Sequence, residues 1–214
     1  MTELILVRHG QSIANLERWF AGHTNAELSE LGRKQAACVG RYVTQHYKID
    51  AIYSSDLSRA YHTALPTAQK LNLPVHTDPA LRELYAGKWE KMNYERLVEE
   101  FPHDFGEVWR YDFSNARCTG GESIAELYDR VCPALLRIAE KHDGQTVLVA
   151  SHATPIRTFA AMALGYDRMH VGEVNILLNA SISRFAVENG VPRVLELNLT
   201  EHLNAIDANS DTVW

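Results

Sequence analysis

Short apolar runs in this chain alternate with longer segments whose apolar residues recur every three or four positions. Three runs have the length of one buried strand each: ELILVR (3–8), AIYS (51–54) and QTVLVAS (145–151). Amphipathic helices are predicted around them, over 29–47, 57–71, 123–142 and 155–164. This alternation predicts an α/β fold of three layers, α/β/α, with helices on both faces of a mostly parallel sheet.

Local signals refine this prediction at several places. Ser29 is a plausible N-cap, whereas Pro66 is expected to kink or split its helix, because proline lacks the N–H that a helix interior needs. Near the C-terminus, 181–188 and 193–199 flank a turn that contains Gly190. We therefore expect an antiparallel edge on the sheet.

A length of 214 residues suits one domain over 1–214, and no linker or repeat divides it. The segment of about 84–118 has a mixed pattern with many aromatic residues, so we predict a lid or insert over a site. These aromatics are favoured as the core of the insert over ligand contacts: Trp89, Tyr94, Phe101, Phe105, Trp109 and Tyr111. The sequence does not show whether the polar segment after Glu201 is ordered.

Composition limits the partners that the chain can have. A formal net charge of −6 with dispersed Lys and Arg argues against nucleic acid as a partner. No apolar stretch approaches the roughly 18 residues that span a bilayer, and the first residues lack a basic leader, so no membrane is expected. Three cysteines without CxxC spacing indicate reduced thiols, and hence a cytoplasmic protein. A homodimer is left open.

Two of the predicted strands end in a histidine. Arg8-His9 follows the first strand and Ser151-His152 follows the third. Because the carboxyl ends of parallel strands meet at one edge of a sheet, two imidazoles distant in sequence can face each other there. A strand-end histidine alone is more often structural than catalytic, so this pattern needs further support.

That support comes from a series of motifs that resembles the phosphoglycerate mutase-like branch of the histidine phosphatase superfamily. The resemblance covers nearly the whole chain, in the order of the family: LVRHGQS (6–12), YSSDLSRAYHTA (53–64), LREL around Glu83, GES (121–123) and SHATPIR (151–157). It implies a phosphoglycerate mutase-like fold and a phosphomonoesterase that forms a phosphohistidine intermediate.

The resemblance implies a catalytic role for five residues. His9 matches the nucleophile that attacks phosphorus, and Arg8 and Arg59 match two arginines that bind the phosphoryl group. Cations beside His9 also keep its imidazole neutral near pH 7. His152 matches a second histidine that stabilises phosphoryl oxygen charge, and Glu83 matches the acid that protonates the leaving oxygen.

Three further residues are candidates for substrate binding. Asn15 stands where the family places a phosphate-contacting asparagine, and Gln11 is a weaker candidate for lining the pocket. Backbone N–H groups around Ala153, at a helix start, suit an oxyanion. Many family members have glycine in place of Ala153, and the effect of this departure on the site is open.

The sequence excludes two other kinds of site. It contains no HExxH and no cysteine pair, so no metal site is predicted, and the family chemistry needs no cofactor. It also lacks the GxxxxGK[ST] phosphate loop, and Gly120-Gly121 fits a turn before the helix at Ser123.

The main prediction is a metal-independent phosphatase for a small phosphorylated metabolite. A cofactor-dependent phosphoglycerate mutase is the alternative, but the paired arginine of mutases is absent between 88 and 117, and Ala86 replaces a tyrosine. A non-catalytic member that only binds a phospho-ligand is a further alternative, although all five catalytic residues are present. Sugar phosphates, phosphoglycerates, α-ribazole phosphate, nucleotide-like esters and phosphoproteins all remain open as substrates.

Overall fold

The computed structural model describes residues 1–204 and 206 and places six strands in one sheet, in the order β3-β2-β4-β1-β5-β6. The first four strands in this order are mutually parallel, and β5 and β6 are antiparallel to their neighbours. The strands are β1 (Thr2–Arg8), β2 (Ala51–Ser54), β3 (Val75–Thr77), β4 (Thr146–Ser151), β5 (Ile182–Glu188) and β6 (Val191–Leu199). The predicted α/β fold is confirmed, with two antiparallel strands at one edge.

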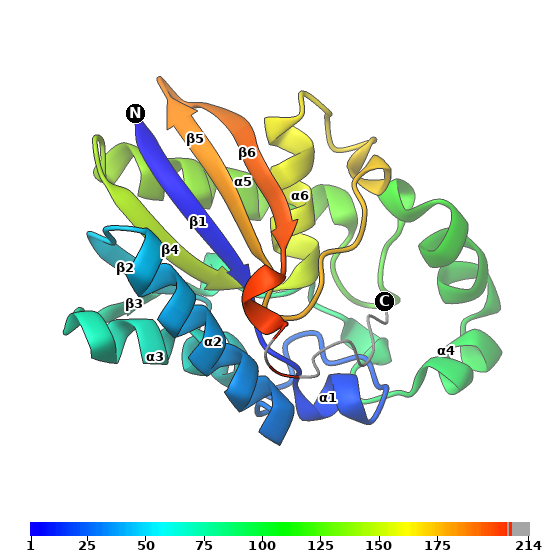
Figure 1. Ribbon diagram of the computed structural model, residues 1–214. Helices are drawn as coiled ribbons and strands as arrows, with labels where there is room; N and C mark the ends of the chain where they lie inside the picture. Colours follow the sequence, from blue (N-terminus) through cyan, green and yellow to red (C-terminus); the bar gives the residue numbers. More distant parts are fainter. Residues whose placement is uncertain (205, 207–214) are drawn as a thin grey trace.

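Helices cover both faces of the sheet, as Figure 1 shows. Helices α2 (Glu30–His46) and α3 (Ser58–Leu71) pack on one face, where the buried side chains of β1 are Ile5 and Val7. Helices α5 (Ile124–Lys141) and α6 (Ala153–Ala163) pack on the other face, against Leu4 and Leu6. Successive strand residues point to opposite faces, so one apolar run supplies two cores.

The helix starts follow the capping residues in the sequence. The Ser29 hydroxyl accepts from the Gly32 N–H, so α2 begins directly after its predicted N-cap. Ser123 and Glu126 cap α5 reciprocally, which satisfies two N–H groups at the helix start. At the other end of the chain, Asn189 and Gly190 both have positive φ and form the tight turn between β5 and β6.

Pro66 does not split α3, so of the two outcomes that the sequence predicts, a kink or a split, the split is wrong. The helix runs from Ser58 to Leu71 with Pro66 inside it. A β-carbon added to Gly40 of α2 would lie 2.8 Å from the Pro66 β-carbon, so the two helices approach closely at this point. Packing against α2 therefore compensates for the hydrogen bond that proline removes.

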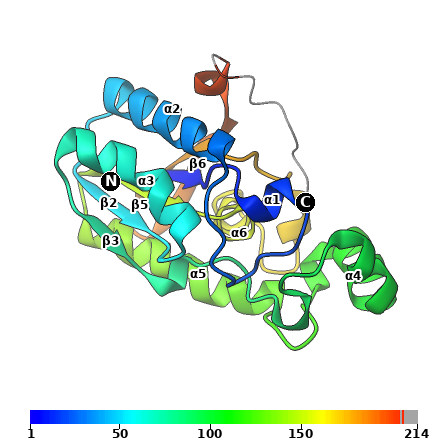
Figure 2. The same cartoon turned by 90° about the horizontal axis from the view of Figure 1, so that it is seen from below.

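The segment 84–118 lies to one side of the sheet, around α4 (Tyr94–Glu100), as Figures 1 and 2 show. Its other helical turns are η2 (Gly87–Trp89), a π-helical segment at Pro102–Trp109 and η4 (Phe113–Asn115). Trp89 and Phe105 are buried, and Phe20 packs edge-to-face against both. These rings form a core for the segment, whereas Tyr111 is 82 % exposed. Whether the segment acts as a lid stays a prediction.

The remaining helical turns are short: α1 (Ile13–Leu16), η1 (Pro79–Leu81), η5 (Val171–Glu173) and η6 (Glu201–Leu203). Most of the polar C-terminal segment, whose order the sequence leaves open, lies outside the described residues. Within the described part of the chain, no helix combines the length and the apolar character needed to cross a bilayer.

Candidate active site

The carboxyl ends of β1 and β4 bring two histidines together at one edge of the sheet. Arg8 pairs with Ser151 in the parallel ladder, and the His9 N–H donates to the Ser151 carbonyl at 2.9 Å. The rings of His9 and His152 consequently meet edge to face, with centroids 5.1 Å apart. Strand register alone explains why residues 143 positions apart in sequence become neighbours (152 − 9 = 143).

The His9 side chain is held in one neutral tautomer. Its Nδ1 lies 2.7 Å from the Gly10 carbonyl oxygen, which can only accept, so Nδ1 carries the proton and Nε2 keeps its lone pair. Burial lowers the pKa of His9 well below its usual value, and the charges of Arg59 and Arg8 lower it further. His9 therefore presents the unprotonated nitrogen that a nucleophile needs.

Arg8 and Arg59 are buried cations that keep part of their hydrogen-bonding capacity. Arg59 donates to the carbonyl oxygens of Thr24 at 2.9 Å and Gly22 at 2.8 Å, and Arg8 donates to the Leu177 carbonyl. The Nε of each guanidinium is buried without a partner among the described residues. Burial lowers the pKa of both groups to about 10, so both stay charged near pH 7. Such a pair is suited to bind a phosphoryl group.

His152 is completely buried and its two ring nitrogens have different surroundings. Nε2 lies 2.8 Å from the Ser55 hydroxyl, whereas Nδ1 has no partner among the described residues. Burial, followed by the charge of Arg59, lowers the pKa of His152 well below its usual value. When Ser55 donates to Nε2, the imidazole proton lies on Nδ1, and the neutral ring can still donate to an anion.

Glu83 lies beyond the end of η1 and faces the start of α6. Its Oε1 accepts from the Leu84 N–H at 2.9 Å, and the Thr154 N–H donates to Oε2 at 3.5 Å. Ala153 is the first residue of α6, directly after His152. The N–H groups of this first turn add partial positive charge at the same place.

A cavity of about 60 Å³ lies beside His9, the two arginines and Glu83, a size that admits a few atoms and not a whole metabolite. His152 is not one of its lining residues. Six of the predicted site residues line it: Arg8, His9, Asn15, Arg59, Glu83 and Ala153. The other lining residues are Ser12, Trp19, Phe20, Ala21, Gly22, Tyr94, Trp109 and Thr154. A cation-rich cavity of this size suits the phosphoryl end of a larger molecule.

The two remaining polar candidates from the signature motif have different positions. The Ser12 N–H donates to Asn15 at 3.0 Å, which identifies the accepting atom as Oδ1 and leaves the Asn15 Nδ2 to donate. Gln11 does not line the cavity. Its Oε1 accepts from the Ser29 hydroxyl at 2.7 Å, and its backbone packs against Gly32. Gln11 therefore supports the start of α2.

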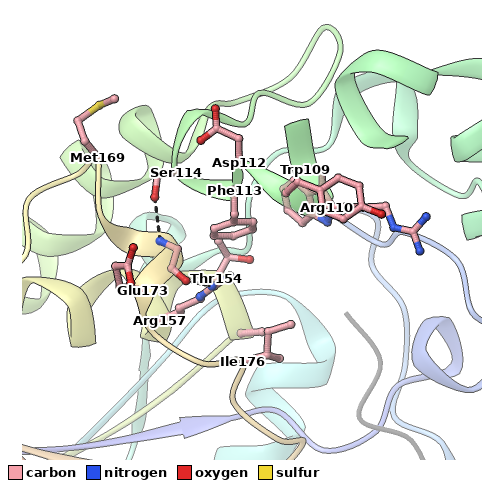
Figure 3. Close-up of a pocket in the computed structure, with 13 residues that line it drawn as sticks. Trp109, Arg110, Asp112, Phe113, Ser114, Thr154, Arg157, Met169, Glu173 and Ile176 are labelled. Carbon is pink, nitrogen blue, oxygen red and sulfur yellow. Dashed lines mark hydrogen bonds between the residues drawn. The ribbon is translucent and has the colours of Figure 1, made fainter. Parts of the chain in front are cut away.

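A wider chamber of about 590 Å³ shares three lining residues with the small cavity: Trp109, Ala153 and Thr154 (Figure 3). Figure 3 shows Phe113 beside Arg157, whose guanidinium carbon lies 4.0 Å from the Phe113 ring centre. The chamber is also lined by aromatic, apolar and charged side chains, including Tyr111, Met169, Ile176, Arg110, Asp112 and Glu173. It has the volume of a typical small-molecule site.

Sequence reasoning missed two residues that hydrogen-bond to the histidines, Ser55 and Asn179. Ser55 stands inside the YSSDLSRA motif, but only the pairing of β2 with β4 brings it to His152. The Asn179 side chain donates to the His9 carbonyl at 3.1 Å and to Asn15 at 3.3 Å from a loop without a recognisable motif. In the described residues, no group of three or more His, Cys, Asp or Glu side chains is placed to hold a metal ion.

Comparison with known proteins identifies the family. The family model described as the histidine phosphatase superfamily, branch 1, matches residues 4–200. The chain belongs to this superfamily. The match covers the whole sheet except the first residues of β1, and all eight predicted site residues lie within it.

This histidine phosphatase is similar to proteins that are named for different activities. Phosphoserine phosphatase 1 of Hydrogenobacter thermophilus is 36% identical over 95% of both chains. A probable phosphoglycerate mutase of Salmonella choleraesuis is 36% identical over 86% of this chain and 84% of its own. A mycobacterial glucosyl-3-phosphoglycerate phosphatase, solved in complex with VO3, has a TM-score of 0.85 at 27% identity, covering 92% of this chain and 99% of its own.

The buried histidines make the stability of this histidine phosphatase sensitive to acid. Burial lowers the folded-state pKa of His9 and His152. Below pH about 6.5, these two histidines therefore take up protons in the unfolded chain but stay neutral in the native state. We expect the free energy of unfolding to fall by up to about 1.4 kcal/mol per pH unit for each residue in this range. Urea unfolding at pH 7.5, 6 and 5 measures the slope.

Two variants serve as controls for this slope. His152→Gln should flatten it, whereas His103→Gln, at an exposed position, should leave it unchanged. An equal slope in wild type and His152→Gln would show that His152 titrates alike in both states.

Proposed function

We propose that this histidine phosphatase hydrolyses a small phosphomonoester through a covalent phosphohistidine on His9, without a metal ion. One observation carries the proposal: a single small cavity is lined by a neutral His9, two buried arginines and the Glu83 carboxyl. The arginines supply the positive charge that a metal ion supplies in many other phosphoryl-transfer enzymes.

In the first step, the lone pair on His9 Nε2 attacks phosphorus. The bond between phosphorus and the ester oxygen breaks, and the departing oxygen takes a proton from the Glu83 carboxyl. Arg8 and Arg59 bind the non-bridging oxygens as their charge rises, and His152 Nδ1 donates to the same group. The products of this step are an alcohol and phosphohistidine.

In the second step, water enters the place of the alcohol. The Glu83 carboxylate accepts a proton from this water as its oxygen attacks phosphorus, and the bond between phosphorus and Nε2 breaks. Orthophosphate leaves, and His9 returns to its starting form. Asn15 and the N–H groups at Ala153 serve as additional donors to the phosphoryl oxygens. Gln11 has no part in this scheme because its side chain accepts from the hydroxyl of Ser29, the N-cap of α2, instead.

The chamber beside the cavity supports a substrate with a body beyond its phosphoryl group. Trp109 and Thr154 border both spaces, so a phosphate in the small cavity can carry an organic group into the chamber. The mixed aromatic and charged lining fits a small phosphorylated metabolite better than a bare phosphate. The activities in the names of the relatives include phosphoserine and phosphoglycerate chemistry, which does not narrow the substrate class further.

Phosphoglycerate mutase activity is the second candidate, because one relative is a probable mutase. A mutase must hold its intermediate away from water and bind a carboxylate with additional basic groups. The segment 88–117 offers separated arginines at 96, 110 and 117, and Ala86 is buried and small. These features favour hydrolysis over return of the phosphoryl group.

A panel assay tests the proposed reaction. The purified protein, in EDTA, is incubated with p-nitrophenyl phosphate and with phosphorylated metabolites that include phosphoserine and 3-phosphoglycerate. We expect phosphate release that EDTA does not reduce. Activity that EDTA abolishes and Mg²⁺ restores would refute metal independence. Conversion of 3-phosphoglycerate to 2-phosphoglycerate would favour the mutase, and no turnover of any ester would favour a binding protein.

The cellular setting stays a prediction. Cys38, Cys118 and Cys132 are buried and unpaired, in keeping with a reducing compartment such as the cytoplasm. A homodimer is compatible with the chain, and size-exclusion chromatography with light scattering measures its mass directly.

A further inference from the structure

The Glu83 segment follows an irregular path, and one side chain of another element donates to three carbonyl groups in and next to it. Between η1 and η2, residues 82–86 belong to no helix or strand. Arg130, on α5, donates to the carbonyl oxygens of Ala80 at 2.9 Å, Arg82 at 3.0 Å and Glu83 at 3.2 Å. A segment without regular structure needs such partners for its buried backbone groups.

Arg130 is itself fixed by a carboxylate from the same region. Its Nε and Nη2 donate to the two oxygens of Glu122 at 2.8 and 2.7 Å, in a bidentate pair. Glu122 also accepts from the Tyr85 N–H at 3.1 Å, and its own N–H donates to the Tyr85 carbonyl at 2.8 Å. The Arg130 and Glu122 side chains are 24% and 14% exposed, so solvent screens this pair only weakly.

A second side chain, that of His23, also contacts the Glu83 carbonyl. His23 Nε2 lies 2.8 Å from the Glu83 carbonyl oxygen, and because that oxygen only accepts, Nε2 is the donor. The backbone of Glu83 is therefore held by Arg130 and His23 together, while its carboxyl reaches the N–H groups of Leu84 and Thr154. Among the described residues, Arg130 makes no hydrogen bond to the groups proposed to bind the phosphoryl group.

We propose that Arg130, fixed by Glu122, is a positioning residue that aims the Glu83 carboxyl at the leaving oxygen. This inference rests on the proposed function, in which Glu83 is the acid. Arg130 donates to the backbone carbonyl of Glu83, so it acts on where the proton donor stands. A displacement of the order of 1 Å in a positioned group costs about 10²-fold in rate.

The role predicts a dependence on the leaving group. An alkoxide is a strongly basic product and needs a proton as the bond breaks, whereas p-nitrophenolate leaves as a stable anion. The ratio kcat/KM reports the steps up to departure of the leaving group, so the later attack of water does not enter it. Loss of Arg130 should therefore reduce kcat/KM for an alkyl phosphate more than for p-nitrophenyl phosphate.

The test compares Arg130→Gln, Arg130→Lys and wild type with phosphoserine, or the best alkyl ester of the panel, and with p-nitrophenyl phosphate. We expect Arg130→Gln to lower the ratio of the alkyl to the aryl kcat/KM by about 10- to 100-fold. Arg130→Lys, which keeps the charge but on a single nitrogen, should recover part of this loss. Arg137→Gln, an exposed position on the same helix, should leave the ratio unchanged.

A double-mutant cycle makes the test specific to Glu83. In a Glu83→Gln background, the Arg130 substitution should leave the alkyl rate nearly unchanged, because the proton donor is already absent. Equal losses for both esters, or full additivity with Glu83→Gln, would overturn the positioning role. Wild-type protein that cleaves neither ester would instead refute the proposed function itself, which separates the two failures.

Discussion

Replacing His9 by alanine should lower phosphomonoester turnover by a factor on the order of 10⁴ to 10⁶. Alanine has no lone pair to attack phosphorus, and direct attack by water lacks the two-step route that the nucleophile provides. Arg8 and Arg59 would still bind the phosphate, so substrate affinity should persist while kcat collapses. Phosphate release from p-nitrophenyl phosphate and from the best metabolite measures the effect.

His62→Ala is the matched control for this variant, because His62 lies exposed on α3. It should keep wild-type turnover. Thermal unfolding of both variants shows whether the fold survives removal of the buried His9 ring. A His9→Ala protein that folds and keeps more than about a tenth of wild-type activity would contradict the nucleophile assignment.

Replacing Arg59 by lysine should lower kcat/KM by about 10²- to 10⁴-fold although the charge is kept. The Arg59 guanidinium donates to the Gly22 and Thr24 carbonyls, and its Nε has no partner in the described part of the chain. A lysine ammonium cannot reproduce this planar, forked geometry. Steady-state kinetics, together with inhibition by vanadate, measures both the rate and the affinity for a phosphoryl-like anion.

Arg41→Lys provides the control, since Arg41 is exposed on α2 and does not line the cavity. It should match wild type in both measurements. Arg59→Lys kinetics within about threefold of wild type, with unchanged vanadate inhibition, would refute a direct role for the guanidinium.

Much of the fold could be predicted because its signals are local. Apolar runs that suit buried strands and helical faces with spacings of three and four residues yield the three layers, and Ser29 and Ser123 cap the helices that follow them. The short strand β3, Val75–Thr77, was not predicted, because its half-exposed residues carry no apolar pattern. β3 forms by pairing with β2, more than 20 residues earlier in the chain, and the local sequence does not show this contact.

The candidate site shows the same division between local and tertiary information. The motifs identify residues that carry chemistry, and six of the eight candidates line one cavity. Gln11 does not line this cavity although it stands two residues after His9, because its side chain hydrogen-bonds to Ser29. Ser55 and Arg130 act through hydrogen bonds to distant residues, so no single stretch of sequence reveals them.

The most direct test of the account is to trap the phosphorylated protein during turnover. Rapid quenching into base, followed by mass spectrometry of peptides, locates any added phosphoryl group and tests its lability in acid, which is typical of phosphohistidine. We predict one acid-labile phosphoryl group on His9, formed before steady-state product release and absent from His9→Ala. A phosphoryl group on another residue, or turnover that continues in His9→Ala at the wild-type rate, would contradict the account.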